Sequence, residues 1–244
     1  MRNLKAVIPV IFVGLMPLFT SCSKEPADIP FEPFSWESST PGEEGMNASL
    51  LDSAFILASG YGFVDALLVV RNGKIVAEGY YNGFTADIPH NIMSVSKSML
   101  SAIAGLVLDG SYGLDLEDRM LDYFPQYNKE ELDPRKQDIS IKHLLTMRMG
   151  IESESHNNYS VYSELYQSEN WIKSTIEYPI SYDPGESMRY NTFITHLLSG
   201  VIREATGKGT DKFAHEHLFA PMGIDIDYWE RIPRASASGE IPCM

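Results

Sequence analysis

The chain has little cysteine, no Cys/His group with the spacing of a metal site and no long apolar run. Each absence excludes a class of protein or site. Only two cysteines, Cys22 and Cys243, occur among 244 residues, which excludes a disulfide-rich fold. No Cys/His group has the spacing of a zinc site. The nearest pattern, His215-Glu216-His217, places its histidines on different sides of a helix. We therefore expect no metal and no cofactor.

Basic charge is also scarce. Lys and Arg number 19 against 33 Asp and Glu, so the formal net charge is −14, and no basic run or stripe occurs. Nucleic acid is therefore not an expected partner. The acidic residues are spread along the chain, which favours solubility. The length is sufficient for one or at most two domains, and we find neither internal repeats nor low-complexity blocks.

The N-terminus has the pattern of a targeting signal. A basic start, residues 1–5, precedes an apolar run over 6–19, whose 14 residues are fewer than the ~20 needed to span a bilayer. The run ends Leu18-Phe19-Thr20-Ser21-Cys22, which resembles a bacterial lipobox with Phe19 where Leu is more usual. The pattern predicts cleavage before Cys22 and a lipid on that cysteine. An ordinary signal peptide cut nearby, or an uncleaved anchor, remains an alternative.

These features predict three segments. Residues 1–21 form a signal peptide, and residues 22–45, rich in Pro, Ser and Glu, form a lipid-anchored tether. Residues 46–244 form the folded domain. The predicted location is the bacterial cell envelope, with the protein facing the periplasm from the inner or outer membrane.

Hydrophobic periodicity predicts a helix over 46–59 and two strands over 63–70 and 75–81. Asn72-Gly73 between the strands is a strong hairpin signal. The segment 96–109 is apolar nearly all round, which predicts a helix buried on every side. Further helices are expected over 115–123, 141–147 (with Ser140 as N-cap), 170–178, 192–206 and 211–222. No clear strand follows Tyr81.

The most informative stretch is Ser94-Val95-Ser96-Lys97, at the start of the apolar helix. Residues three apart share one face of a helix, and the N-terminal end of a helix favours developing negative charge. A desolvated lysine there can take the proton of the serine and make it a nucleophile. The structural alternative is a helix N-cap at Ser94 with a solvated Lys97. A second match, Ser21 to Lys24, lies in the targeting segment and opens no helix.

With this motif between a hairpin and an apolar helix, the chain resembles the serine β-lactamase-related family, which includes class C β-lactamases, DD-peptidases, esterases and nylon-oligomer hydrolases. The resemblance covers roughly residues 36–229 and rests on six pieces in order: residues 67–78, 94–98, 122–125, 139–147, 184–192 and 218–224. It implies an α+β fold of the β-lactamase/transpeptidase type. In that fold an antiparallel sheet is covered by helices, beside an all-helical subdomain.

The resemblance also implies site residues. The second motif of the family, Tyr-x-Asn a few residues after Pro-Gly, corresponds here to Tyr190-Asn191-Thr192 after Pro184-Gly185. Tyr190 would shuttle protons, and Thr192, which replaces the asparagine, would contact substrate. A literal Tyr-x-Asn at Tyr80–Asn82 lies in the hairpin and is discarded. The third motif lies on a later strand in the family, so we expect this chain to be incomplete at its C-terminus and to lack the C-terminal strands.

These observations predict a serine hydrolase for a small ester or amide, with catalytic Ser94, Lys97 and Tyr190 and an acyl-enzyme intermediate. Thr192 in place of asparagine favours such substrates over β-lactams. Two alternatives stay open: a non-catalytic fragment or pseudoenzyme that binds peptidoglycan-type peptides, and a β-lactamase or DD-peptidase. A third, an α/β-hydrolase, needs Gly-x-Ser-x-Gly, which does not occur.

Overall fold

The structure is a computed structural model that describes residues 35–127, 129–154, 159–226, 228–229, 231–232 and 241–242. The predicted signal peptide (1–21), the predicted lipid site Cys22 and the tether up to residue 34 lie outside the described residues, as does Cys243. The residues described below fall within one compact unit, Pro33–Met244.

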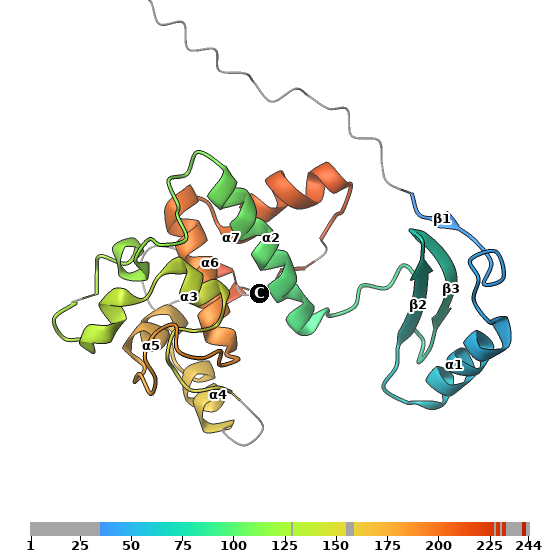
Figure 1. Cartoon of the computed structure of the whole chain (residues 1–244), viewed down its shortest axis with the longest axis horizontal. Helices are drawn as coiled ribbons and strands as arrows, with labels where there is room; N and C mark the ends of the chain where they lie inside the picture. Colours follow the sequence, from blue (N-terminus) through green and yellow to red (C-terminus); the bar gives the residue numbers. More distant parts are fainter. Residues whose placement is uncertain are drawn as a thin grey trace, which may run out of the picture. The chain divides into compact units, whose positions relative to one another are not determined.

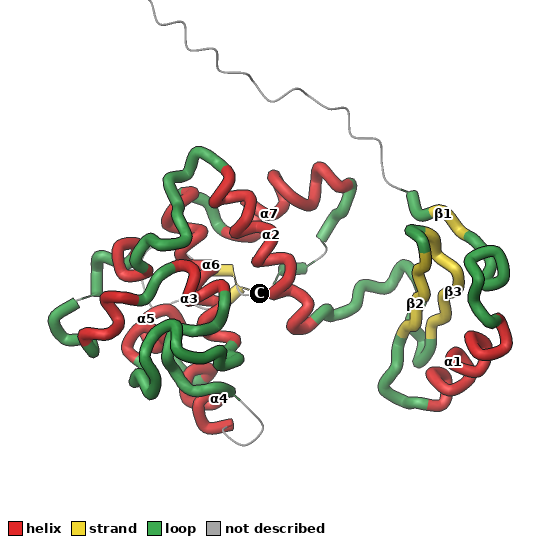
Figure 2. The backbone as a smooth tube through the Cα atoms, in the orientation of Figure 1, coloured by secondary structure: helices red, strands yellow, loops and turns green. Residues whose placement is uncertain are grey.

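A three-stranded sheet of order β1-β3-β2 forms the N-terminal part (Figures 1 and 2). Strands β2 (Ala66–Arg71) and β3 (Lys74–Tyr80) pair antiparallel, from Ala66 opposite Tyr80 to Arg71 opposite Lys74. The turn residues Asn72 and Gly73 have φ of 50° and 77°, and two positive φ values are what a tight hairpin turn of the favoured hand requires. The predicted hairpin is confirmed.

Secondary structure is present within residues 22–45, the stretch predicted to be the tether. Strand β1 (Glu37–Ser38) pairs in parallel with β3, so the sheet is mixed rather than purely antiparallel as expected. The turn that follows is also fixed, because Glu44 accepts a 2.7 Å hydrogen bond from Asn72 and lies 3.5 Å from the Lys74 ammonium. Two residues of strand give no periodic signal, which is why the sequence did not indicate β1.

Helix α1 (Ala48–Gly60) lies beside the hairpin (Figure 1). The side chain of Asn47 caps it by accepting from the N–H of Leu50 at 3.1 Å. The ring of Phe55 lies against Gly79, where a Cβ would come within 2.8 Å of the ring. The helix and strand β3 can therefore approach closely only because position 79 has no side chain.

The rest of the described chain is helical. Its α-helices are α2 (Ser96–Asp109), α3 (Ile141–Leu145), α4 (Tyr159–Tyr166), α5 (Trp171–Glu177), α6 (Thr192–Thr206) and α7 (Thr210–Ala214). Short 3-10 turns are η1 (Met93–Val95), η2 (Met120–Tyr123), η3 (Pro134–Asp138) and η5 (Ala220–Met222), and η4 (His215–Phe219) is a π-helical turn. A two-residue ladder joins β4 (Arg231–Ile232) to β5 (Ile241–Pro242), although we expected no strand after Tyr81.

One apolar core joins α2, α3 and α6. Helix α2 contributes Leu100, Ile103, Ala104 and Val107, all fully buried. The prediction that α2 is buried on every side is wrong for the described residues, because Ala102 is exposed and Leu106 is 38% exposed. Helix α2 therefore buries one face.

Two further elements differ from expectation. The segment 115–123 forms only the 3-10 turn η2, because the carboxylates of Asp115 and Asp118 accept from the N–H groups of Glu117 and Asp115, at 2.9 and 2.8 Å. Such side-chain bonds compete with helix formation. Helix α4 was not predicted; it buries Val161 and Leu165 against Phe193 of α6.

Across the part of the chain that the structure describes, no helix combines the length and apolar character that a membrane crossing requires.

Candidate active site

Ser94 lies in the 3-10 turn η1, directly before α2. Met93 has φ of 47°, a left-handed conformation that is uncommon for a residue with a side chain. Two hydrogen bonds hold it there: its N–H donates to Asn91 Oδ1 at 2.8 Å, and its carbonyl accepts from Ser96 Oγ at 2.7 Å. The strained turn presents the Ser94 hydroxyl at the N-terminal end of α2, with its side chain exposed.

The structure brings the three predicted catalytic side chains together. Lys97 Nζ donates to Ser94 Oγ at 3.3 Å, from one turn along the helix. Tyr190, 96 residues away in sequence, donates its hydroxyl to the same oxygen at 2.8 Å. Lys97 Nζ also lies 5.2 Å from the centre of the Tyr190 ring. Ser94 Oγ is thus contacted by two groups that can exchange protons with it.

Tyr190 is held at the start of α6. Asn191 caps that helix, with its Oδ1 accepting from the N–H of Phe193 at 2.9 Å. The preceding loop packs on the residues after α3, because Arg189 N–H donates to Met147 O at 2.9 Å and Gly185 N–H donates to Arg148 O at 2.8 Å. Tyr190 is therefore placed by the cap of α6 and by the anchored loop before it.

Thr192, the predicted substrate contact, is engaged within the protein. Its hydroxyl donates to Glu154 Oε1 at 2.5 Å, and its N–H donates to Glu154 Oε2 at 2.9 Å. Sequence reasoning missed Glu154, and no local signal could have found it because it lies 38 residues before its partner. The role of Thr192 towards substrate stays a prediction.

A second pair that the sequence did not indicate, Asp65 and His90, holds the segment before Ser94. His90 Nε2 lies 2.7 Å from Asp65 Oδ2, and the His90 ring lies 4.9 Å from that of Phe84. The hydrogen bond to Asp65 raises the pKa of His90, and the same bond lowers the pKa of Asp65. The pair therefore favours the charged forms of both groups.

The His215-Glu216-His217 pattern lies in η4. Glu216 forms an ion pair with Lys208, and the His217 ring lies 4.3 Å from that of Phe213. No cluster of three or more potential metal ligands occurs among the described residues.

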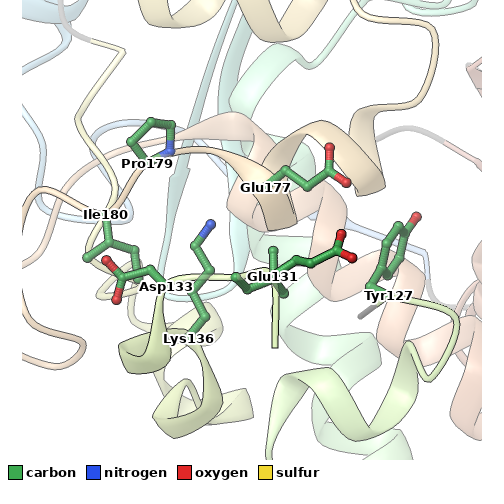
Figure 3. Close-up of a pocket in the computed structure, with 8 residues that line it drawn as sticks. Tyr127, Glu131, Asp133, Lys136, Glu177, Pro179 and Ile180 are labelled. Carbon is green, nitrogen blue, oxygen red and sulfur yellow. The ribbon is translucent and has the colours of Figure 1, made fainter. Parts of the chain in front are cut away.

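A cavity of about 480 Å³ lies in the helical part, and none of the three predicted catalytic residues lines it (Figure 3). Its polar lining includes Glu131, Asp133, Glu177 and the buried Lys136. Lys136 Nζ donates to Ile176 O at 2.6 Å, near the C-terminal end of α5, and burial lowers the pKa of this lysine. The ammonium thus satisfies a carbonyl at a helix end, which is a structural role.

Comparison with known proteins decides the family. A family model described as Beta-lactamase matches residues 62–237, most of the chain and all three catalytic candidates. The chain belongs to the β-lactamase family. The predicted resemblance is confirmed.

Proteins named for different activities are similar to this chain. The candidate penicillin-binding protein PbpX of Bacillus subtilis (strain 168) is 28% identical over 173 residues, 67% of this chain and 40% of that protein. The 6-aminohexanoate-dimer hydrolase of Paenarthrobacter ureafaciens is 37% identical over 62 residues, 25% of this chain and 16% of that protein. The chain spans about half or less of the length of the curated relatives it matches.

The structural comparison shows the fold. A D-stereospecific amidohydrolase from Streptomyces sp. superposes with a TM-score of 0.58 at 18% identity, covering 78% of this chain and 60% of that chain. The predicted α+β fold of the β-lactamase/transpeptidase type is confirmed, with helices and a small sheet in the described residues.

Proposed function

We propose that this chain carries the active site of a serine hydrolase that cleaves an ester or amide bond through an acyl-enzyme. The observation that carries the proposal is the approach of Tyr190 to Ser94, at 2.8 Å, on the oxygen that Lys97 also contacts at 3.3 Å. A nucleophile within hydrogen-bond reach of its base and of a second proton-transfer group is the geometry that acyl transfer requires.

The chemistry follows from these contacts. Neutral Lys97 takes the proton of Ser94 as Oγ bonds to the substrate carbonyl carbon, and the carbonyl oxygen becomes an oxyanion at the N-terminal end of α2, where the helix dipole favours it. The bond to the leaving group then breaks, the leaving group takes a proton from Tyr190, and Lys97 returns a proton to Tyr190. Water repeats the sequence in reverse and releases the acid from Ser94.

The proposed substrate class is a small ester or amide rather than a β-lactam. Thr192 occupies the position of the family asparagine, and its hydroxyl hydrogen is already donated to Glu154. It therefore offers a substrate no amide donor. The names of two similar proteins, a 6-aminohexanoate-dimer hydrolase and an amidohydrolase, agree with amide chemistry.

A second candidate function is penicillin or peptidoglycan-peptide recognition, as a DD-peptidase, a β-lactamase or a non-catalytic binder. The name of the Bacillus subtilis relative favours it.

We further propose that the protein is anchored in the bacterial envelope by a lipid on Cys22, since a basic start and a short apolar run end at that cysteine.

The function is tested by the intact mass of the full chain after incubation with a fluorophosphonate and, separately, with a penicillin. Ser94→Ala is compared with Ser101→Ala, a control at an exposed serine of α2. We expect one fluorophosphonate adduct on the wild type and on Ser101→Ala, none on Ser94→Ala, and little or no penicillin adduct.

A fluorophosphonate adduct that persists in Ser94→Ala contradicts the assignment of the nucleophile. A penicillin adduct on Ser94 instead supports the second candidate function. A wild-type chain that is folded by circular dichroism and takes neither adduct supports the non-catalytic alternative.

A further inference from the structure

The residue that would shuttle protons has a fixed backbone. The carbonyl of Tyr190 accepts two hydrogen bonds, from the N–H of Glu154 at 3.1 Å and from the hydroxyl of Ser153 at 3.0 Å. On the next residue, the side-chain amide of Asn191 (Nδ2) donates to Glu152 O at 3.0 Å. The segment 152–154 therefore binds the backbone of Tyr190 and the side chain of the residue after it.

The carboxylate of Glu154 completes this attachment. Its two oxygens accept separately from the N–H and the hydroxyl of Thr192, at 2.9 and 2.5 Å. Thr192 is the first residue of α6, a 15-residue helix, and a carboxylate is favoured at such a terminus by the unpaired N–H groups and the helix dipole. Bonds from an ionised acceptor are also stronger than neutral ones. Of the five bonds between the two segments, these two have the strongest acceptor.

The position of the phenol depends on this attachment. Tyr190 is 38% exposed, so its ring is not fixed by burial, and its hydroxyl must still reach Ser94 Oγ at 2.8 Å. A backbone shift at residues 190–192 moves the hydroxyl with it. Misplacement by about 1 Å can cost on the order of 10²-fold in rate.

We propose that Glu154 is a positioning residue for Tyr190: its carboxylate holds the start of α6 so that the tyrosine hydroxyl meets the nucleophile. This inference rests on the proposed function, in which Tyr190 transfers protons to and from the Ser94 site.

Glu152 is the matched control that the chain offers. It is the same residue type two positions earlier, but its carboxylate accepts from the hydroxyl of Tyr182 at 3.0 Å. Its side chain therefore serves a different residue, and its backbone carbonyl, which binds Asn191, is unchanged by substitution.

The first experiment is a double-mutant cycle on the rate of Ser94 labelling by a fluorophosphonate in the full chain. We expect Glu154→Ala to slow labelling by about 10- to 100-fold and Glu152→Ala by less than about 3-fold. Glu154→Gln retains most of the rate, because its amide can still accept from the Thr192 N–H and donate to the Thr192 oxygen. In a Tyr190→Phe background, Glu154→Ala should cost less than about 2-fold, since the group it positions is gone.

A second measurement does not depend on reactivity. With fluorotyrosine incorporated, the ¹⁹F signal of Tyr190 is the one missing in Tyr190→Phe. Glu154→Ala should shift or broaden that signal, and Glu152→Ala should leave it in place. Should Glu154→Ala fail to fold, Thr192→Val removes one of the two bonds from the other side and should move the same signal.

The inference is overturned if Glu154→Ala slows labelling equally with and without the Tyr190 hydroxyl, or if the Tyr190 signal stays unchanged. A wild-type chain that takes no label contradicts the proposed function instead, and the ¹⁹F signal still decides whether Glu154 positions Tyr190.

Discussion

At the scale of single residues, the candidate site depends on one oxygen atom. Ser94 Oγ accepts hydrogen bonds from Lys97 Nζ at 3.3 Å and from the Tyr190 hydroxyl at 2.8 Å, so two groups that can transfer protons contact it. A serine hydroxyl is a weak nucleophile by itself and needs such a partner. The left-handed Met93 before it is a local conformational cost at the site.

Tyr190→Phe isolates the contribution of one of these partners. The substitution keeps the ring beside Lys97 and removes only the hydroxyl, so we expect ester hydrolysis to fall by roughly 10²- to 10⁴-fold, the usual range for a general acid or base. Tyr182→Phe is the control, because that hydroxyl donates to Glu152 and not to Ser94. Steady-state rates on a chromogenic ester make the comparison, and equal losses in both variants would contradict the assignment.

At the scale of elements, helix α6 takes part in both the candidate site and the apolar core. Its first residues hold Tyr190, and ten of its fifteen residues, from Phe193 to Ile202, are buried. One of them is His196, 3% exposed, with its ring edge-on to Trp171 at 5.5 Å. Burial disfavours the charged form of this histidine and lowers its pKa to about 3.

This buried histidine makes the protein sensitive to acid. The unfolded chain binds a proton near pH 6.5 and the folded chain does not, so stability is full above that pH and falls towards pH 3. The slope attributable to one such group is at most about 1.4 kcal/mol per pH unit. Urea unfolding at a series of pH values measures it. The variant His196→Leu should have a flatter acid limb, and an unchanged limb would show that other groups dominate.

The turn after α3 depends on a glycine. Gly150 has φ of 97°, and a Cβ there would lie 2.4 Å from the carbonyl oxygen of Tyr182. Gly150→Ala should lower the free energy of unfolding by more than about 2 kcal/mol. Gly105→Ala is the opposite case: it lies in α2 with no atom within 4 Å of the added Cβ, and alanine should raise stability by about 0.5–1 kcal/mol. Urea unfolding of both variants checks the two signs.

At the scale of the whole molecule, the proposed lipid anchor and the folded domain depend on different parts of the sequence. Strand β1, within the predicted tether, pairs with β3. The net charge of −14 is spread over the chain, which favours solubility.

The two cysteines allow a direct test of the anchor. In a bacterial host grown with labelled palmitate, the wild type and Cys243→Ser should incorporate the label, and Cys22→Ser should not. Incorporation that persists in Cys22→Ser, or that is absent from the wild type, would contradict a lipid on Cys22.

Much of the element structure could be predicted because its causes are local. The bounds of α2 and α6 follow from apolar spacing, and Asn72-Gly73 specifies the hairpin through two positive φ values. The motif Ser94–Lys97 is equally local, since one helical turn places the two side chains together. Tyr190 was reached through family resemblance and not from spacing.

The tertiary structure decided the contacts between residues far apart in the sequence. The sequence by itself determined the hairpin, the two long helices and the serine–lysine pair, because each depends on residues a few positions apart. Only the packing of α6 against α2 and α3 brings Tyr190 to Ser94 across 96 residues and Glu154 to Thr192 across 38. Packing also leaves one side of α2 exposed, against the expectation from its composition. Contacts between distant residues depend on how whole faces bury one another, and the local pattern of either segment does not specify its partner.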